Sequence, residues 1–206
     1  MNTLPTRGRI AAVLALLALG SSLRAQDPDP LAKLDPASRR AVELLIDSAR
    51  AEGLPTRQLI STVQHGNSKH VDGPRIAAVV RTVFLSFREA RVALGPNFAS
   101  DELEAAAAAL QAGIPTDAVT ELRSARRGKS ITVPLVVVAD LVTRGVPRDA
   151  ASSAILQLWL GGAGDADLLT LPQRVQTDIL SGATPGDALQ HQTKQIPIRL
   201  PPSKLP

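Results

Sequence analysis

Residues 113–119 read GIPTDAV, and this stretch decides the fold of the 206-residue chain because it marks a junction between two helices. Gly113 can adopt the left-handed conformation that lets a helix end, since it has no Cβ. Pro115 has a fixed φ and no N–H, which suits the first turn of the next helix. The stretch therefore predicts the end of one helix and the start of another, with the apolar Ile114 turned into the core between them.

Versions of this junction recur along the chain. They are Gly53 with Pro55, Gly145 with Pro147 and, one residue longer, Gly182 with Pro185. A connection this short forces consecutive helices to run antiparallel. The turn glycines at 113, 145 and 182 are 32 and 37 residues apart, which is the size of a two-helix repeat. The sequence thus predicts an all-α fold of about eight or nine helices, arranged as antiparallel hairpins in an irregular bundle or a short α-solenoid.

The first 25 residues have the pattern of an export signal. Arg7 and Arg9 precede an unbroken apolar run, residues 10–19, that is too short to span a bilayer. We expect cleavage after Ala25 and export to the periplasm or the medium. Residues 26–34 are predicted to be a linker, residues 35–194 a single helical-hairpin domain, and residues 195–206 a proline-rich tail that is extended or disordered.

Composition argues against several classes of function. Without the three arginines of the export signal, the chain has 20 basic and 19 acidic residues, so it lacks the charge of a nucleic-acid-binding protein. Three Phe, one Trp and no Tyr are too few for a base-stacking platform. The chain has no Cys, which excludes disulfides and lipid attachment at cysteine. No apolar run after the signal is long enough to span a membrane.

Residues 65–72 contain the polar cluster that most resembles a metal site, with His65, His70 and Asp72. The two histidines are five residues apart, whereas ligands on one helical face are three or four apart, and the zinc-protease motif is absent. A second interpretation aligns His70 with the turn glycine and Asp72 with the turn proline, where a carboxylate can cap the following helix. We favour the turn, and we expect no metal and no cofactor.

Two of the expected helices have an apolar side that periodicity assigns to the core. In the first helix, the apolar residues within 42–46, Leu44 among them, are assigned to the core. In the long helix expected over residues 74–94, apolar side chains fall on one side, and Arg81 and Arg88 fall on the other. An anionic partner could bind these arginines, but we predict a solvated helix face.

Further along the chain, residues 134–142 are apolar nearly all round and predict a buried helix. Asp140 and Arg144 are four residues apart with the acid first, which favours an ion pair along that helix. Asp140 is the one carboxylate expected to be partly buried. Ser100 is expected to cap the alanine-rich helix that follows it, and residues 161–164 (GGAG) are expected to be a flexible break.

The favoured function is that of an exported, non-enzymatic helical scaffold or protein-binding module of the bacterial cell envelope, with another envelope protein as its partner. It rests on the export signal, the hairpin repeats and the lack of recognisable catalytic motifs. One alternative is a small all-helical hydrolase acting on cell-wall glycan through carboxylates. The candidate residues for that chemistry are Glu43, Glu52, Asp72 and Asp140. Another is a lipid-binding helical protein, which would need a large apolar cavity between helices.

Overall fold

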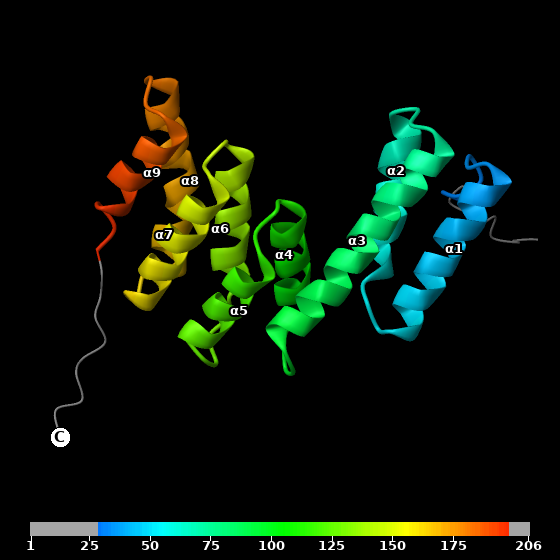
Figure 1. Cartoon of the computed structure of the whole chain (residues 1–206), viewed down its shortest axis with the longest axis horizontal. Coiled ribbons are helices and arrows are strands. Elements are labelled where there is room, and N and C mark those ends of the chain that lie inside the picture. Colours follow the sequence, from blue (N-terminus) through cyan, green and yellow to red (C-terminus); the bar gives the residue numbers. More distant parts are fainter. Residues whose placement is uncertain (1–28, 198–206) are drawn as a thin grey trace, which may run out of the picture.

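A computed structural model describes residues 29–197, and within this range the chain forms nine α-helices and no strand (Figure 1). The helices are α1 (Pro36–Ala51), α2 (Thr56–Ser68), α3 (Gly73–Leu94), α4 (Ser100–Gln111), α5 (Thr116–Ala125), α6 (Thr132–Thr143), α7 (Arg148–Leu160), α8 (Asp165–Leu180) and α9 (Pro185–Thr193). The predicted all-α fold is confirmed. The predicted export signal, residues 1–25, lies outside the described residues.

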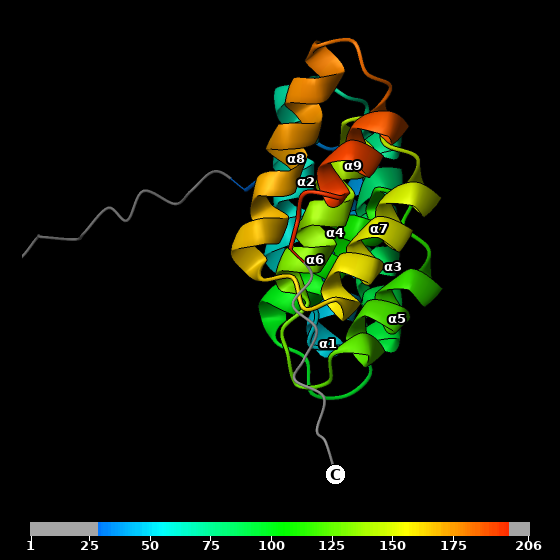
Figure 2. The ribbon, with the colours of Figure 1, turned by 90° about the vertical axis from the view of Figure 1, so that its left-hand side faces the viewer.

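The helices stack in two layers along one long axis (Figure 1). In one layer α3 packs on α4, α4 on α6 and α6 on α8, and in the other α3 packs on α5, α5 on α7 and α7 on α9. Figure 2 looks along the stack and shows α4, α6 and α8 beside α5, α7 and α9. Because α3 contacts both layers and also α1 and α2, it joins the first helices to the rest of the stack.

Six of the eight connections between helices use the same turn. Its first residue has a positive φ, at Gly53, His70, Gly113, Gly145, Gly162 and Gly182. The next residue donates its N–H to the carbonyl five residues earlier, at 2.8–3.1 Å in every copy. This pair of features is a Schellman motif, which satisfies the last carbonyls of the helix. The segment GGAG at 161–164 is therefore an ordered copy of the turn, not the flexible break that its glycines suggested.

Proline has a different place in the turn from the one predicted. Pro55, Pro115 and Pro147 each precede the first helical residue, as N-caps with extended ψ, whereas Pro185 is the first helical residue after Thr184. The short turn leaves two residues between the positive-φ position and the next helix, and the second of them, the N-cap, has an extended ψ. Proline fits there because its fixed φ is compatible with an extended backbone.

The two ends of the domain are more ordered than expected. Within the predicted linker, Leu34 is buried and donates its N–H to Leu31, and Pro30 accepts a hydrogen bond from Asn67 of α2. In the predicted tail, Ile196 is buried against the core. Burial of an apolar side chain stabilises each of these segments against the helices. Residues 198–206 lie outside the described range, as do residues 26–28. Within residues 29–197, no helix combines the length and the apolar character that crossing a bilayer requires.

Glu102 links three elements near the middle of the stack. Its buried carboxylate accepts hydrogen bonds from the backbone N–H of Ala99 at 3.1 Å and of Ile131 at 3.0 Å, the residues that precede α4 and α6. Arg123 of α5 donates to the same carboxylate at 3.0 Å. One side chain therefore caps two helix N-termini and pairs with a third helix.

The position of Glu102 corrects two predictions: that Ser100 caps α4, and that Asp140 is the one partly buried carboxylate. Ser100 is the first residue of α4 and makes no cap, because Glu102 reaches back to the preceding N–H instead. Asp140 forms the predicted ion pair with Arg144, at 2.9 Å, and it is partly buried as predicted, with its side chain 40% exposed. The side chain of Glu102 is only 5% exposed, so Glu102 is the more deeply buried carboxylate.

A glycine inside α2 gives the first testable prediction. Alanine in place of glycine normally stabilises a helix interior by about 1 kcal/mol. At Gly66, however, an added Cβ would lie 2.6 Å from Cγ1 of the buried Ile76 in α3. Overpacking of this kind costs about 1–3 kcal/mol, so we expect Gly66→Ala to lower the urea midpoint of unfolding. Gly186→Ala is the matched control, because its Cβ would meet nothing within 4 Å and should be neutral or stabilising. An increase in the midpoint for Gly66→Ala would show that α2 and α3 do not pack this closely.

The contact between α8 and α9 gives a prediction about the pH dependence of stability. Asp178 Oδ2 lies 2.9 Å from Nδ1 of His191 and accepts a hydrogen bond from Gln192 at 2.8 Å. These bonds, that with His191 foremost, hold the pKa of Asp178 below its usual value. A lowered folded-state pKa stabilises the fold above the unfolded-state pKa, about 3.9, and this contribution is lost as the pH falls through the folded-state value. We therefore expect Asp178→Asn to be less stable than the native chain at pH 7, and the two unfolding midpoints to converge below about pH 3. A gap that persists at pH 2 would contradict this assignment.

Candidate protein-binding groove

The polar cluster of His65, His70 and Asp72 belongs to the turn between α2 and α3 and to the helix end before it. His70 has φ +55°, in the left-handed region, and its N–H donates to the carbonyl of Asn67. The carboxylate of Asp72 caps α3 by accepting from the N–H of Arg75 at 3.2 Å. His65 belongs to the last turn of α2. Within residues 29–197, no group of three or more His, Asp or Glu side chains is arranged to hold a metal ion.

Each of the four candidate catalytic carboxylates has a structural partner. Glu43 pairs with Arg39 at 2.9 Å, and Glu52 with Arg91 at 2.7 Å. Asp140 is held by Arg144, and Asp72 by the α3 N-terminus. Among the described residues, no hydrogen bond or ion pair brings any two of the four together. Each of the four thus has a structural role in the described part of the chain.

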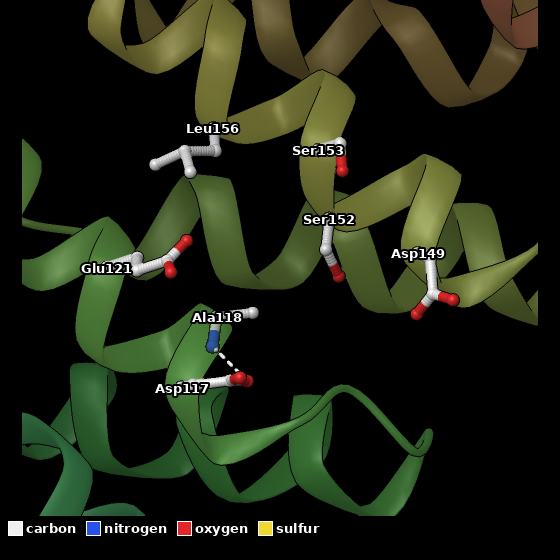
Figure 3. Close-up of a pocket in the computed structure, with 7 residues that line it drawn as sticks. All are labelled: Asp117, Ala118, Glu121, Asp149, Ser152, Ser153 and Leu156. Atoms are coloured by element: carbon white, nitrogen blue, oxygen red, sulfur yellow. Dashed lines mark hydrogen bonds between the residues drawn. The ribbon is translucent and has the colours of Figure 1, made fainter.

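A small acidic pocket lies between α5 and α7 (Figure 3). Its volume is about 160 Å³, and Asp117, Glu121 and Asp149 line it together with Ser152. Asp117 accepts a hydrogen bond from the N–H of Ala118 at 2.8 Å. Asp117 and Asp149 belong to the first turns of α5 and α7, where a carboxylate stabilises the helix dipole. Interaction with a helix dipole accounts for two of the three acids in this pocket.

A larger concavity is an apolar groove between α1 and α3, which we call the α1–α3 groove. It has a volume of about 570 Å³ and is open to solvent. From α1 it is lined by Ala41, Leu44, Leu45 and Ser48, and from α3 mainly by Arg81, Phe84, Leu85 and Arg88. Leu44 is 54% exposed and Leu85 is 47% exposed, so each helix presents a leucine to solvent at this groove. Exposed leucines that gather in one groove mark a binding surface more often than scattered ones do.

The α3 side of the groove is positively charged. Arg88 stacks over the ring of Phe84, with its guanidinium carbon 5.8 Å from the ring centroid, and its Nε lies 3.3 Å from a carboxylate oxygen of Glu52. Arg91 also holds Glu52, through both its carboxylate and its backbone carbonyl. These contacts anchor the end of α1 against α3. Arg81 is exposed and makes no ion pair within residues 29–197.

The groove corrects the assignment of Leu44 to the core. Periodicity does place this residue on the apolar side of α1, and Val42 and Ile46 of the same segment are buried. The apolar side of α1 is wider than the part of it that α2 and α3 cover. Leu44 therefore lies at the uncovered edge of that apolar side. Arg81 and Arg88 are exposed, as predicted, but they border the groove instead of forming an isolated polar face.

Comparison of the chain with protein-family models, with curated proteins and with solved structures finds no match in any of the three. The architecture alone therefore defines the class of protein, a two-layer stack of helical hairpins with an open groove near its N-terminal end.

Proposed function

We propose that the protein is an exported, non-enzymatic helical scaffold of the bacterial cell envelope, and that it binds another envelope protein through the α1–α3 groove. The observation that carries this proposal is the groove itself, with Leu44 and Leu85 exposed on its two sides. Hiding large apolar side chains from water is the main source of free energy in protein association. A stack of hairpins offers a rigid, extended frame for such a surface.

The candidate carboxylates also favour binding over catalysis. Each of them is engaged by an arginine or by a helix N-terminus, which is the role that structural carboxylates have in folded proteins. The groove is open to solvent, so it suits a segment of another protein better than it suits a lipid chain, which is usually enclosed.

The proposal can be tested by photo-crosslinking in the cells that naturally produce the protein. A photoreactive amino acid replaces Leu44 in one variant and Leu85 in another, and adducts of the full-length chain are identified by mass spectrometry. We expect both positions to yield the same protein adduct, because the two side chains line one groove.

The control places the same photoreactive residue at Gln173, on the exposed side of α8. This position should yield no such adduct. Adducts that appear equally at Gln173, or the absence of any protein adduct at Leu44 and Leu85, would overturn the proposed function. Recovery of the adduct in the cytoplasmic fraction alone would overturn the expected location.

A further inference from the structure

We infer that the occupant of the α1–α3 groove is an amphipathic α-helix of another protein that carries acidic side chains along one edge. This inference rests on the proposed function and names the chemistry of the partner. It follows from the spacing of the residues that line the groove, from the hydrogen bonds that those residues can offer, and from their charge.

The spacing of the lining residues fits a third helix. On α1 the groove is lined at positions 41, 44, 45 and 48, and on α3 at positions 77, 78, 81, 84, 85 and 88. The α1 set follows the i, i+3, i+4, i+7 pattern of one helical face over two turns. The α3 set recurs every three or four residues along one face over about three turns. Two such faces side by side form the groove into which the apolar ridge of a further helix packs. The groove is thus lined over about 10 Å along α1 and about 16 Å along α3, which matches two to three turns of a partner.

The available hydrogen bonds also favour a helix over an extended peptide. A strand leaves its backbone N–H and C=O groups unpaired and needs a sheet edge to satisfy them. Both walls of this groove are helices, whose backbone groups are already paired within α1 and α3. An amphipathic helix satisfies its own backbone and needs only apolar contact from the groove.

Charge decides which helix fits. Arg81 and Arg88 are the only charged side chains that line the groove, and they lie seven residues apart on the same face of α3. Arg88 already faces Glu52, whereas Arg81 makes no ion pair in the described part of the chain. A partner with Asp or Glu two turns apart along one edge places a carboxylate beside each guanidinium. A lysine-rich helix would meet two like charges instead.

The same charges argue against a second copy of this chain. Two copies that meet groove to groove bring Arg81 and Arg88 of both chains into one interface, as the symmetry of such a contact requires. Like charges held together at an interface are unfavourable. The groove itself supplies no carboxylate to offset them.

The test is a selection with the purified full-length protein. A displayed library of amphipathic helices, each about 20 residues long, has leucines at i, i+3, i+4 and i+7 and randomised charge at the flanking positions. We expect the protein to enrich helices with Asp or Glu on one flank. Arg81→Glu should weaken binding of the selected helix by about tenfold or more, and a selection repeated with that variant should enrich Lys or Arg at the same flank. Arg81→Lys should keep the preference for acidic helices.

Arg57→Glu is the matched control, because Arg57 is exposed on α2 and does not line the groove. It makes the same change in net charge and should leave the selected composition unchanged. Circular dichroism of every variant checks that the helical fold is intact. Equal effects of Arg57→Glu and Arg81→Glu would show that only the net charge matters, and this would overturn the inference.

The remaining outcomes separate the inference from the proposed function. Enrichment of helices without a charge preference, or of basic helices, overturns the acidic partner while the crosslinked adduct still supports a binding groove. Failure to enrich any helix overturns the inference. Self-association that light scattering detects, and that Leu44→Glu abolishes, would show that a second copy occupies the groove and would overturn it as well. Absence of the crosslinked adduct in cells overturns the proposed function itself.

Discussion

Replacing Glu102 with alanine should lower the free energy of unfolding by about 3–5 kcal/mol, because it removes one member of a buried charge pair. The change leaves Arg123 without its carboxylate and leaves the N–H groups of Ala99 and Ile131 without their acceptor. In a domain of this size, each kcal/mol shifts the melting temperature by about 2–4 °C. Thermal unfolding followed by circular dichroism should therefore show a decrease of roughly 6–20 °C.

Two further variants make this prediction specific. Glu104→Ala alters an exposed carboxylate on the same helix and should change stability by less than about 0.5 kcal/mol. Glu102→Gln keeps an acceptor for the backbone N–H groups but loses the charge opposite Arg123, so its stability should lie between those of the native chain and Glu102→Ala. A decrease for Glu102→Ala no larger than that for Glu104→Ala would mean that Glu102 does not join α4, α5 and α6.

Trp159→Ala is expected to destabilise the fold to a similar extent, by about 3–5 kcal/mol, because it opens a large cavity in the core. Trp159 is 2% exposed in α7, and the guanidinium carbon of Arg126 lies 4.0 Å from the centroid of its ring. Arg126 also donates to the carbonyl of Ala163 in the turn between α7 and α8. Loss of the ring thus removes both core volume and the surface on which this arginine rests.

The variant Trp159→Phe distinguishes the effect of losing ring volume from the effect of losing the indole N–H. The indole Nε1 of Trp159 is buried and has no hydrogen-bond partner among the described residues. Phenylalanine therefore loses no hydrogen bond and keeps an aromatic face for Arg126. We expect it to cost clearly less than alanine, by about 2 kcal/mol or more, in urea unfolding followed by circular dichroism. Equal losses for the two variants would show that the indole N–H, and not the ring volume, stabilises this site.

The turns could be predicted from sequence because each requires only a short local pattern. That pattern is a residue that tolerates a positive φ, followed by an apolar residue. Even the copy with His70 could be found by alignment, since Asp72 caps the next helix from the expected position. The copy at Gly162 escaped prediction because neighbouring glycines suggested flexibility, although Ala163 is buried and hydrogen-bonded like its counterparts.

The features that escaped prediction depend on contacts between distant residues. Glu102 is buried by Arg123 and Ile131, which are 21 and 29 residues away, and no pattern around residue 102 reveals them. The exposure of Leu44 depends on how much of α1 its neighbouring helices cover. Periodicity identifies an apolar face but not the helix that packs on it, so the α1–α3 groove was visible only in the assembled fold.

The repeated turn has a consequence for how the molecule can change in length. Its six copies share one hydrogen-bond pattern and require only a single residue with a positive φ, with little dependence on the surrounding side chains. Helices beyond α3 contact near neighbours along the stack. A hairpin bounded by two such turns is therefore an interchangeable unit, and gene duplication or deletion at these junctions can lengthen or shorten the protein while leaving its N-terminal surface unaltered.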